Sequence, residues 1–485
     1  MNTSVEIVLL LSSLLLALSI FISKTGYRFG VPTLLMFLVA GMALGTDGIG
    51  LEFDDVHTAQ NIGMVALCVI LFSGGMDTKI ADIRPVAAPG IVLSTAGVLL
   101  TTALTGVFIY YLSGWEHRTG IGFGILSSML LAATMSSTDS ASVFNILRSQ
   151  KIGLKHHLRP MLELESGSND PMAYLLTILL IQCLGTDGSV GAWSIALSFV
   201  QQFAVGIAAG CGLGWCIVWI FNHIGLKNKE LYPILCLCFI FVIYCVAYLL
   251  GGNGYLAVYI AGMVAGNCKM YMKHETGTFL GGLTWLVQVI MFLILGLLVN
   301  PKEMLSIIPF AIPVGLFMMF AARPLSVWLS LLPFGRRVTS NSKWFISWVG
   351  LKGAAPIIFA TYPVVAGVDG AGQIFNIVFF VTLVSLLLQG MTLPQASRLL
   401  HLNEPVSNDE GNFGVAIPDE IGSRLEELPV TSEMLSHGDR MPDLNLPKGK
   451  LAMLVKRNDG SYIVPDGRTT LATGDILLLI SSEEG

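Results

Sequence analysis

Charged residues are scarce in this sequence. Asp, Glu, Lys and Arg make up 12% of its 485 residues, whereas hydrophobic residues make up 54%. An average soluble domain carries about 25% charged residues. The net charge of -5 is small, so the charge balance gives no indication of nucleic-acid binding. The composition excludes an ordinary water-soluble protein and predicts a polytopic membrane protein.

Two other features are missing. The polar C-terminal part has no cysteine, and all eight cysteines fall in apolar runs, so neither a disulfide framework nor a zinc module is expected. No basic stretch precedes the first apolar run, and no small-residue cleavage pattern follows it. We therefore interpret this run as a retained membrane helix and not as a signal peptide.

Long apolar runs dominate the first 400 residues. A crossing helix needs about 20 apolar residues, and on this basis the sequence predicts thirteen of them. The predicted spans are 5–23, 31–46, 58–75, 86–112, 120–147, 160–184, 192–221, 231–250, 254–268, 277–299, 304–332, 344–364 and 372–393.

The loops between these spans differ in charge. One set of alternate loops collects basic residues such as Arg148 and Lys227, whereas the opposite set carries only Arg118 and Lys302. Short cytoplasmic loops accumulate Lys and Arg. We therefore expect the N-terminus outside and the chain end in the cytoplasm.

After residue 400 the sequence becomes polar. We predict a membrane domain at 1–397, a linker at 398–412 and a small α+β cytoplasmic domain at 413–485. Apolar runs at 451–455, 462–464 and 476–480 alternate with turn signals, a pattern typical of strands and hairpins. No Gly-x-Gly-x-x-Gly follows a strand, so a dinucleotide domain is not expected. Binding of a small molecule or a partner, and dimerisation alone, are the open roles.

Ionisable residues lie inside the apolar spans. A charged side chain near the bilayer centre costs about 2.5 to 3.5 kcal/mol on insertion scales, so each such residue is a functional hypothesis. They are Asp139 in the fifth span, Glu163, Glu165 and Asp170 in the sixth, Arg323 in the eleventh and Lys352 in the twelfth. This pattern indicates a transport site.

Neighbouring residues divide these groups by role. Asp170 stands between Asn169 and Pro171, which is a costly setting for a purely structural carboxyl, so we assign it to the site. Glu165 and Arg323 most simply form a structural pair. Asp139 and Lys352 remain open between compensation of helix dipoles and direct contact with an ion. Glu163 is expected near the cytoplasmic mouth.

Two of the spans are irregular. Glycines and Pro356 surround Lys352, and residues 136–140 around Asp139 are polar. Membrane helices break in this way beside a cavity. If spans 1–6 and 8–13 are two repeats, the broken fifth and twelfth spans correspond, as expected of an inverted-repeat transporter.

Three motifs now carry a resemblance: Thr138-Asp139, Glu165-Ser166-Gly167-Ser168-Asn169-Asp170 and Gly350-Leu351-Lys352-Gly353-Ala354. In this order and spacing the chain resembles the NhaP-type branch of the bacterial monovalent cation/proton antiporters. The resemblance covers the membrane part, and the end of the chain resembles the TrkA-C type of regulatory domain.

The resemblance implies an NhaA/NapA-like fold and a homodimer in the inner membrane, in which spans 4–6 and 11–13 move as an elevator. Asp170 would bind a proton or a cation alternately, and Thr138, Asp139, Ser166 and Asn169 would complete the cation shell. The Asn-Asp pair is similar to the electroneutral type. Potassium is the expected substrate, with sodium or lithium open, in the service of cation, pH and cell-volume homeostasis. Besides the cation and protons, no cofactor is expected.

The sequence gives less support to other functional classes. A sodium/proton antiporter is the nearest alternative. A regulated cation channel would need a selectivity filter, and no repeated filter segment is visible. Ser166 and Ser168 beside carboxylates would suit an intramembrane hydrolase, but no His lies in the core spans to act as a base. We therefore expect no enzyme.

Overall fold

The computed structural model describes residues 33–45, 53–114, 121–150, 152–185, 191–405, 425–431, 434–441, 450–457 and 461–481, with single positions at 13, 17, 50 and 444. The predicted span 5–23 therefore lies outside the continuously described segments. The chain divides into two compact units, Met1–Pro405 and Val406–Gly485.

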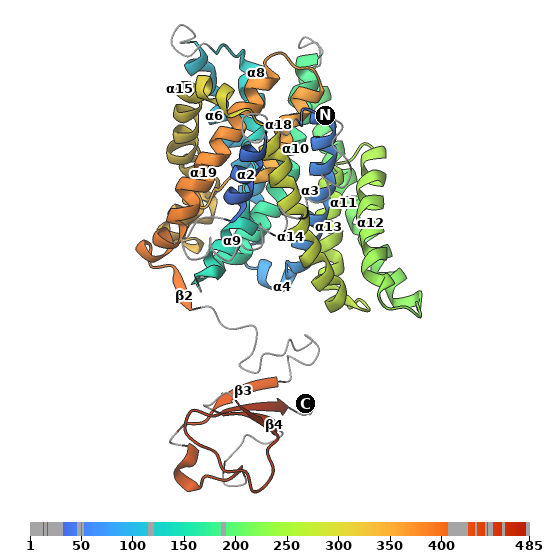
Figure 1. Cartoon of the computed structure of the whole chain (residues 1–485), viewed down its shortest axis with the longest axis vertical. Coiled ribbons are helices and arrows are strands. Elements are labelled where there is room, and N and C mark those ends of the chain that lie inside the picture. The colour runs from blue at the N-terminus through green and yellow to red at the C-terminus, as the bar shows by residue number, and fades with distance from the viewer. Residues whose placement is uncertain are drawn as a thin grey trace. The chain divides into compact units, whose positions relative to one another are not determined.

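The first unit is a helical bundle (Figure 1). Its helices are α2 (Thr33–Leu44), α3 (Val56–Asp77), α4 (Ile80–Ile83), α5 (Ala87–Val92), α6 (Val98–Ser113), α8 (Ile125–Thr134), α9 (Ser140–Ser149), α10 (Leu158–Gly185), α11 (Ala192–His223), α12 (Leu231–Leu249), α13 (Gly254–Asn267), α14 (Lys273–Leu297), α15 (Pro301–Phe317), α16 (Arg323–Ser330), α17 (Ser340–Trp348), α18 (Ala354–Val365) and α19 (Ala371–Leu399).

Each predicted span from 31–46 onward coincides with a helix or with consecutive helices. In the described part of the chain, seven helical stretches are long and apolar enough to cross a membrane, while α2, α8 and α18 are shorter apolar helices. Of the other six predicted spans, one lies outside the continuously described residues, two are broken into short helices, and α10 carries several charged residues. The remaining two are α2 and α13, which are only 12 and 14 residues long. The fold is thus a helical polytopic bundle, and thirteen crossings remain a prediction.

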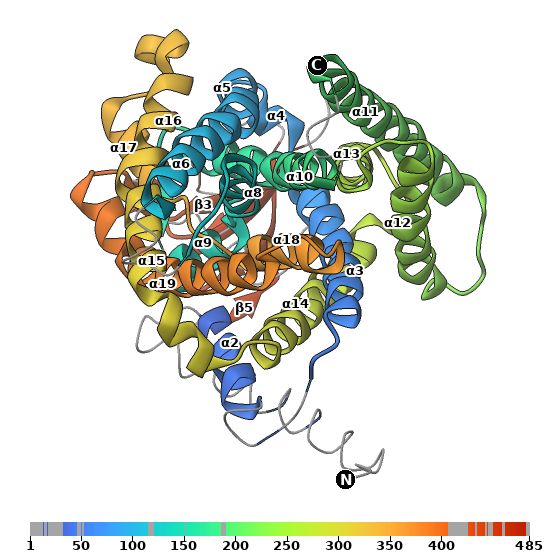
Figure 2. The same cartoon turned by 90° about the horizontal axis from the view of Figure 1, so that it is seen from above.

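Helices α11 and α12 lie at the edge of the bundle (Figure 2). Trp193, Trp215 and Trp219 on α11 are 81%, 68% and 56% exposed. Large apolar side chains facing outward are costly in water, and lipid removes this cost.

Two helices of the bundle are each interrupted by a π-helical turn. The turn η1 (Leu93–Gly97) joins α5 to α6, and η2 (Met318–Ala322) joins α15 to α16. A π-turn displaces the regular hydrogen bonds, and such turns are frequent at functional sites. The carbonyl of Gly97, at the end of η1, accepts hydrogen bonds from Thr101 Oγ1 at 2.8 Å and from Ser326 Oγ on α16 at 2.6 Å. The two interrupted helices are therefore joined at η1.

Two short strands accompany the helices of the first unit, although the sequence predicts only helical spans before residue 398 and a linker after it. Strand β1 (Ile152–Leu154) connects α9 to α10 and pairs antiparallel with β2 (Asn403–Pro405). Lys155 N also donates to Leu402 O at 3.0 Å, and Leu402 is 2% exposed. The start of the predicted linker is thus folded onto the loop between α9 and α10.

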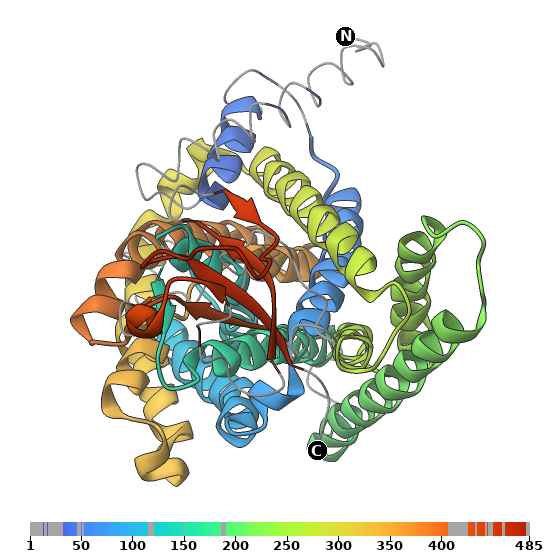
Figure 3. The ribbon, with the colours of Figure 1, turned by 90° about the horizontal axis from the view of Figure 1, so that it is seen from below.

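The second unit contains a four-stranded sheet with the order β3-β6-β4-β5, seen as red and orange ribbons in Figure 3. Its strands are β3 (Leu425–Pro429), β4 (Lys450–Lys456), β5 (Tyr462–Ile463) and β6 (Ile476–Ser481), all paired antiparallel. The three apolar runs predicted as strands are confirmed. Among the described residues of this unit, only the 3-10 turns at η4 (Met434–His437) and Met441 are helical.

Candidate ion site at two broken helices

The fifth and twelfth predicted spans are both interrupted. Helix α8 ends at Thr134 and α9 begins at Ser140, while α17 ends at Trp348 and α18 begins at Ala354. The two interruptions meet, because Asp139 N donates to Leu351 O at 2.9 Å. Gly353 lies so close to Asp139 that a Cβ atom would overlap its carboxylate. The close approach requires glycine at this position.

Asp139 caps the second half of its broken helix. Its Oδ1 accepts from Ser142 N at 3.0 Å, and its Oδ2 accepts from Ser142 Oγ at 2.5 Å. The first backbone N–H groups of a helix have no partner within it, and a side-chain oxygen at the N-cap supplies one. The negative charge also stands at the positive end of the α9 dipole.

Lys352 lies at the other helix end of the first interruption, the C-terminal end of α8. Its Nζ donates to Ser137 O at 2.9 Å and to Ser136 O at 3.5 Å, just after α8 ends. The last carbonyls of a helix carry partial negative charge, so an ammonium stabilises them. Asp139 and Lys352 therefore compensate opposite helix ends at one crossing.

Two residues on α19 support the second interruption, and the sequence analysis did not select them. Lys352 N donates to Ser385 Oγ at 3.0 Å, Ser385 Oγ donates to Gln389 Oε1 at 2.5 Å, and Gln389 Nε2 donates to Trp348 O at 2.9 Å. The available signal is a polar pair at positions i and i+4 of a mostly apolar helix, which places both side chains on one face.

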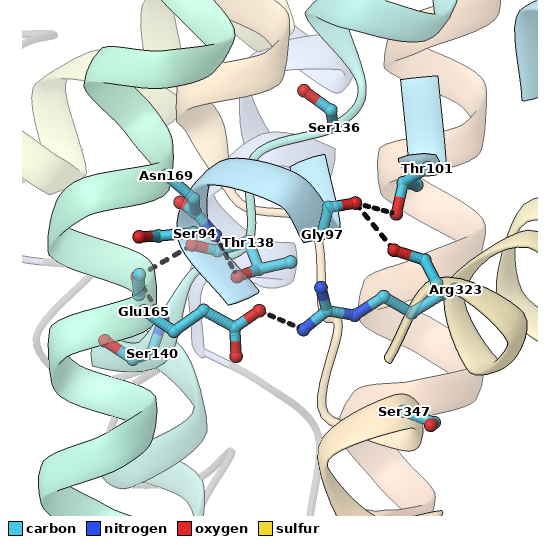
Figure 4. A network of polar contacts seen from close by, with 12 residues as sticks. Ser94, Gly97, Thr101, Ser136, Thr138, Ser140, Glu165, Asn169, Arg323 and Ser347 are labelled. Carbon is cyan, nitrogen blue, oxygen red and sulfur yellow. Dashed lines mark hydrogen bonds and ion pairs between the residues drawn. The ribbon is translucent and has the colours of Figure 1, made fainter. Parts of the chain in front are cut away.

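Helix α10 brings the motif 165–170 against the first interruption. Ser166 Oγ donates to Thr138 O at 2.7 Å and accepts from Ser140 N at 3.0 Å. Asn169 Nδ2 donates to Thr138 Oγ1 at 2.5 Å, and Figure 4 shows these two side chains facing each other. The predicted residues Thr138, Ser166 and Asn169 are thus brought together.

Asp170 is buried beside them. Its exposed fraction is 9%, and its Oδ1 accepts a hydrogen bond from Ser137 Oγ. The sequence analysis placed Ser137 in the polar cluster but not in the site. Asn169 Oδ1 is also buried and has no hydrogen-bond partner among the described residues. A buried oxygen without a partner costs about 1 to 3 kcal/mol, so this acceptor is available to a ligand.

Glu165 and Arg323 form an ion pair (Figure 4). Their side chains are 1% and 5% exposed, and Arg323 Nη2 donates to Glu165 Oε1. Gly350 packs against the Arg323 side chain. The pair thus joins α10 to α16 beside the second interruption. Glu163 lies apart from this network and pairs with Arg159 Nε at 2.9 Å.

The chemistry of the site follows from these donors. Within the described part of the chain, no group of three or more His, Cys, Asp or Glu side chains forms a metal centre. The site instead offers the Asp170 carboxylate, one amide oxygen without a partner among the described residues, and several hydroxyl and backbone oxygens. Hard cations take oxygen ligands of this kind, and the Asp170 carboxylate can alternatively bind a proton.

Comparisons with known proteins agree with this geometry. A family model described as "Sodium/hydrogen exchanger, transmembrane" matches residues 12–398. The K(+)/H(+) antiporter NhaP2 of Shewanella sp. (strain MR-4) is 38% identical over 484 residues, covering 99% of this chain and 82% of that protein. The K(+)/H(+) antiporter NhaP of Alkalimonas amylolytica is 37% identical over 403 residues, covering 83% and 68%. The sodium proton antiporter MjNhaP1 from Methanocaldococcus jannaschii shares the fold, with a TM-score of 0.67 at 21% identity over 80% of this chain and 97% of that chain.

Proposed function

The chain belongs to the transmembrane sodium/hydrogen exchanger family, and from this premise we propose that it exchanges potassium for protons at Asp170. Cation/proton exchange is the activity of the family. Potassium is favoured because the relatives at 38% and 37% identity are named K(+)/H(+) antiporters. Sodium is the alternative substrate, since MjNhaP1 is named a sodium proton antiporter.

Competition for one carboxylate provides the coupling. A cation binds Asp170 only after the carboxyl has lost its proton. Only a site that holds either a proton or a cation moves across the membrane. Because Asn169 precedes Asp170, the site carries one titratable carboxyl there instead of two, and exchange is electroneutral. This assignment goes beyond the fold likeness and is supported by the burial of Asp170 and its contact with Ser137.

The other oxygens complete the cation shell. Asn169 Oδ1 turns to the cation, which supplies the partner that this buried atom lacks among the described residues. Ser137 and Thr138 contribute from the interruption between α8 and α9, and Ser166 contributes from α10. Asp139 and Lys352 hold the helix ends in place, and Glu165 with Arg323 is scaffold. Their hydrogen bonds to helix ends and to each other support these roles.

The wider architecture is proposed on the same grounds. Thirteen crossings form two inverted repeats, with the N-terminus outside and residues 413–485 as a TrkA-C-like regulatory domain in the cytoplasm. The correspondence of the two broken spans supports the repeats. The protein works as an inner-membrane homodimer with elevator-type movement, and a small molecule regulates it through the C-terminal domain.

Substitution at Asp139 separates capping from cation binding. Asn is as good an N-cap as Asp, so Asp139→Asn should retain exchange within about tenfold. Asp139→Ala should lower the stability of the protein by about 1 kcal/mol through loss of the cap, with lower exchange as a consequence. Exchange rates and thermal melting of both variants, compared with the wild type, check this. Complete loss of exchange in well-folded Asp139→Asn would show that its charge is required.

Dissipation of an imposed pH gradient tests the function itself. Proteoliposomes with an acidic interior and a pH-sensitive dye receive K⁺, Na⁺ or Li⁺ outside. K⁺ should discharge the gradient in a saturable manner, without requiring a membrane potential. A channel would instead move cations and shift the potential without obligatory proton movement. If none of the three cations discharges the gradient in liposomes that contain folded protein, the proposed function is wrong.

A further inference from the structure

A cluster of tyrosine rings lies beside the ion site. We call Tyr174, Tyr244, Tyr255 and Tyr362 the tyrosine cluster. The ring centroids of Tyr174 and Tyr255 are 4.8 Å apart at 88°, those of Tyr174 and Tyr362 are 5.3 Å apart at 72°, and those of Tyr244 and Tyr255 are 5.1 Å apart. Aromatic pairs are favourable at these spacings. The cluster joins α10 and α18, which carry or flank the ion site, to α12 and α13.

Hydrogen bonds reinforce this contact. The hydroxyl groups of Tyr255 on α13 and Tyr362 on α18 lie 3.1 Å apart. Asn253, the N-cap of α13, donates from Nδ2 to Pro171 O on α10 at 2.7 Å. Pro171 directly follows Asp170. The start of α13 is therefore held against both ion-site helices.

The remaining contacts of α13 are of a different kind. Gly262 and Gly266 lie against backbone atoms of α3, and Gly210 of α11 lies against the backbone of Ala257. Backbones this close cannot slide past each other without steric overlap. Helices α3, α11 and α13 thus form one tightly interlocked block (Figure 2). Against α10, by contrast, α13 makes contact through aromatic side chains, with the Tyr255 ring edge-to-face with Tyr174 and the Tyr259 ring against Gly167. Small sliding of packed helices is one of the movements that proteins use to switch between states.

The cluster lies on one side of Asp170. Helices α10 and α13 are antiparallel, since Tyr255 contacts Tyr174 while Tyr259 contacts Gly167. Tyr174 lies one turn beyond Asp170, away from β1. Tyr174, Tyr244 and Tyr255 are all at most 8% exposed. On the β1 side of Asp170, the buried Tyr259 hydroxyl has no hydrogen-bond partner within the described chain.

We propose that the tyrosine cluster closes the ion site toward the face opposite β1, the predicted outer face, and that the bond between Tyr255 and Tyr362 breaks each time the site opens there. The inference rests on the proposed exchange and names a contact, the hydrogen bond between Tyr255 and Tyr362, that must break during each exchange cycle. Because this bond exists only in the closed arrangement, it sets the balance between sites open to the two faces.

Removing one hydroxyl tests this balance. Tyr255→Phe keeps the ring and deletes the bond. It should raise the cation concentration for half-maximal exchange at the cytoplasmic face and lower it at the outer face, each by about threefold to tenfold, the factor expected for one hydrogen bond. Everted and right-side-out membrane vesicles present the two faces separately. Tyr362→Phe should give the same pair of shifts, and the double variant no more than either single one.

Tyr232→Phe is the matched control. Tyr232 is equally buried, but its hydroxyl accepts from Leu226 N at 3.1 Å, next to the start of α12 and away from α10 and α18. Tyr232→Phe should leave the cation concentration for half-maximal exchange unchanged at both faces. An equal shift at both faces, or no shift, in Tyr255→Phe and Tyr362→Phe would overturn the proposal while exchange itself stands. Absence of exchange in the wild type would instead overturn the proposed function.

Discussion

Asp170→Asn should abolish cation/proton exchange while the protein folds normally. The amide has nearly the same shape as the carboxyl and can still accept a hydrogen bond from Ser137 Oγ. It cannot bind or release a proton near neutral pH, and it offers a cation no negative charge. Both competing ligands therefore lose their site, and exchange should fall at least about 100-fold, since a buried charged contact contributes at least about 3 kcal/mol when one partner is removed. Dye-reported exchange in proteoliposomes checks the result.

Glu163→Gln provides a control on the same helix. Glu163 pairs with the partly exposed Arg159 and lies outside the ion-site network. A surface pair of this kind contributes about 0 to 1 kcal/mol, so exchange should stay close to the wild-type rate. If folded Asp170→Asn protein exchanged cations for protons normally, competition at this carboxyl could not be the mechanism.

Arg323→Met should destabilise the protein strongly. Loss of the guanidinium leaves Glu165, whose side chain is 1% exposed, as a buried carboxylate without its ion-pair partner. Breaking a buried ion pair in this way costs about 3 to 5 kcal/mol. We expect lower yield in the membrane and a lower melting temperature in detergent. Loss of exchange should follow from the loss of folded protein.

The double variant Glu165→Met, Arg323→Met separates scaffold from transport. Apolar residues of similar volume often replace a buried ion pair without loss of stability. The double variant should therefore melt well above Arg323→Met and exchange cations at a substantial rate. Normal stability combined with absent exchange would assign the pair a direct part in transport.

Much of the site could be predicted because charge inside an apolar span is costly and therefore conspicuous. Asp170, Glu165, Arg323 and Lys352 stand out on that ground alone. Ser385 and Gln389 did not, because neutral polar residues are tolerated in membrane helices and only their contacts with the second interruption reveal a role. The tyrosine cluster cannot be predicted from the sequence for a related reason, since aromatic residues are ordinary in apolar spans.

The strand β2 shows a second limit. Residues 403–405 have the polar composition of a linker, and their pairing with β1 joins positions about 250 residues apart in the chain. Backbone pairing over such a distance leaves little trace in local composition. The composition of residues 403–405 therefore gives no indication of this contact, while the strands of the C-terminal unit are recognisable from their own alternation of apolar runs and turns.

The sequence by itself determined that this is a helical membrane protein with interrupted spans and ionisable residues inside them, because burial of apolar surface and the cost of buried charge act on each segment locally. Tertiary structure alone decided which groups meet. Only the crossing of the two interruptions places Asp139 against Gly353, and Lys352 against the end of α8. Helix ends attract charge whatever its place in the sequence, so the partner of each end depends on how the helices pack.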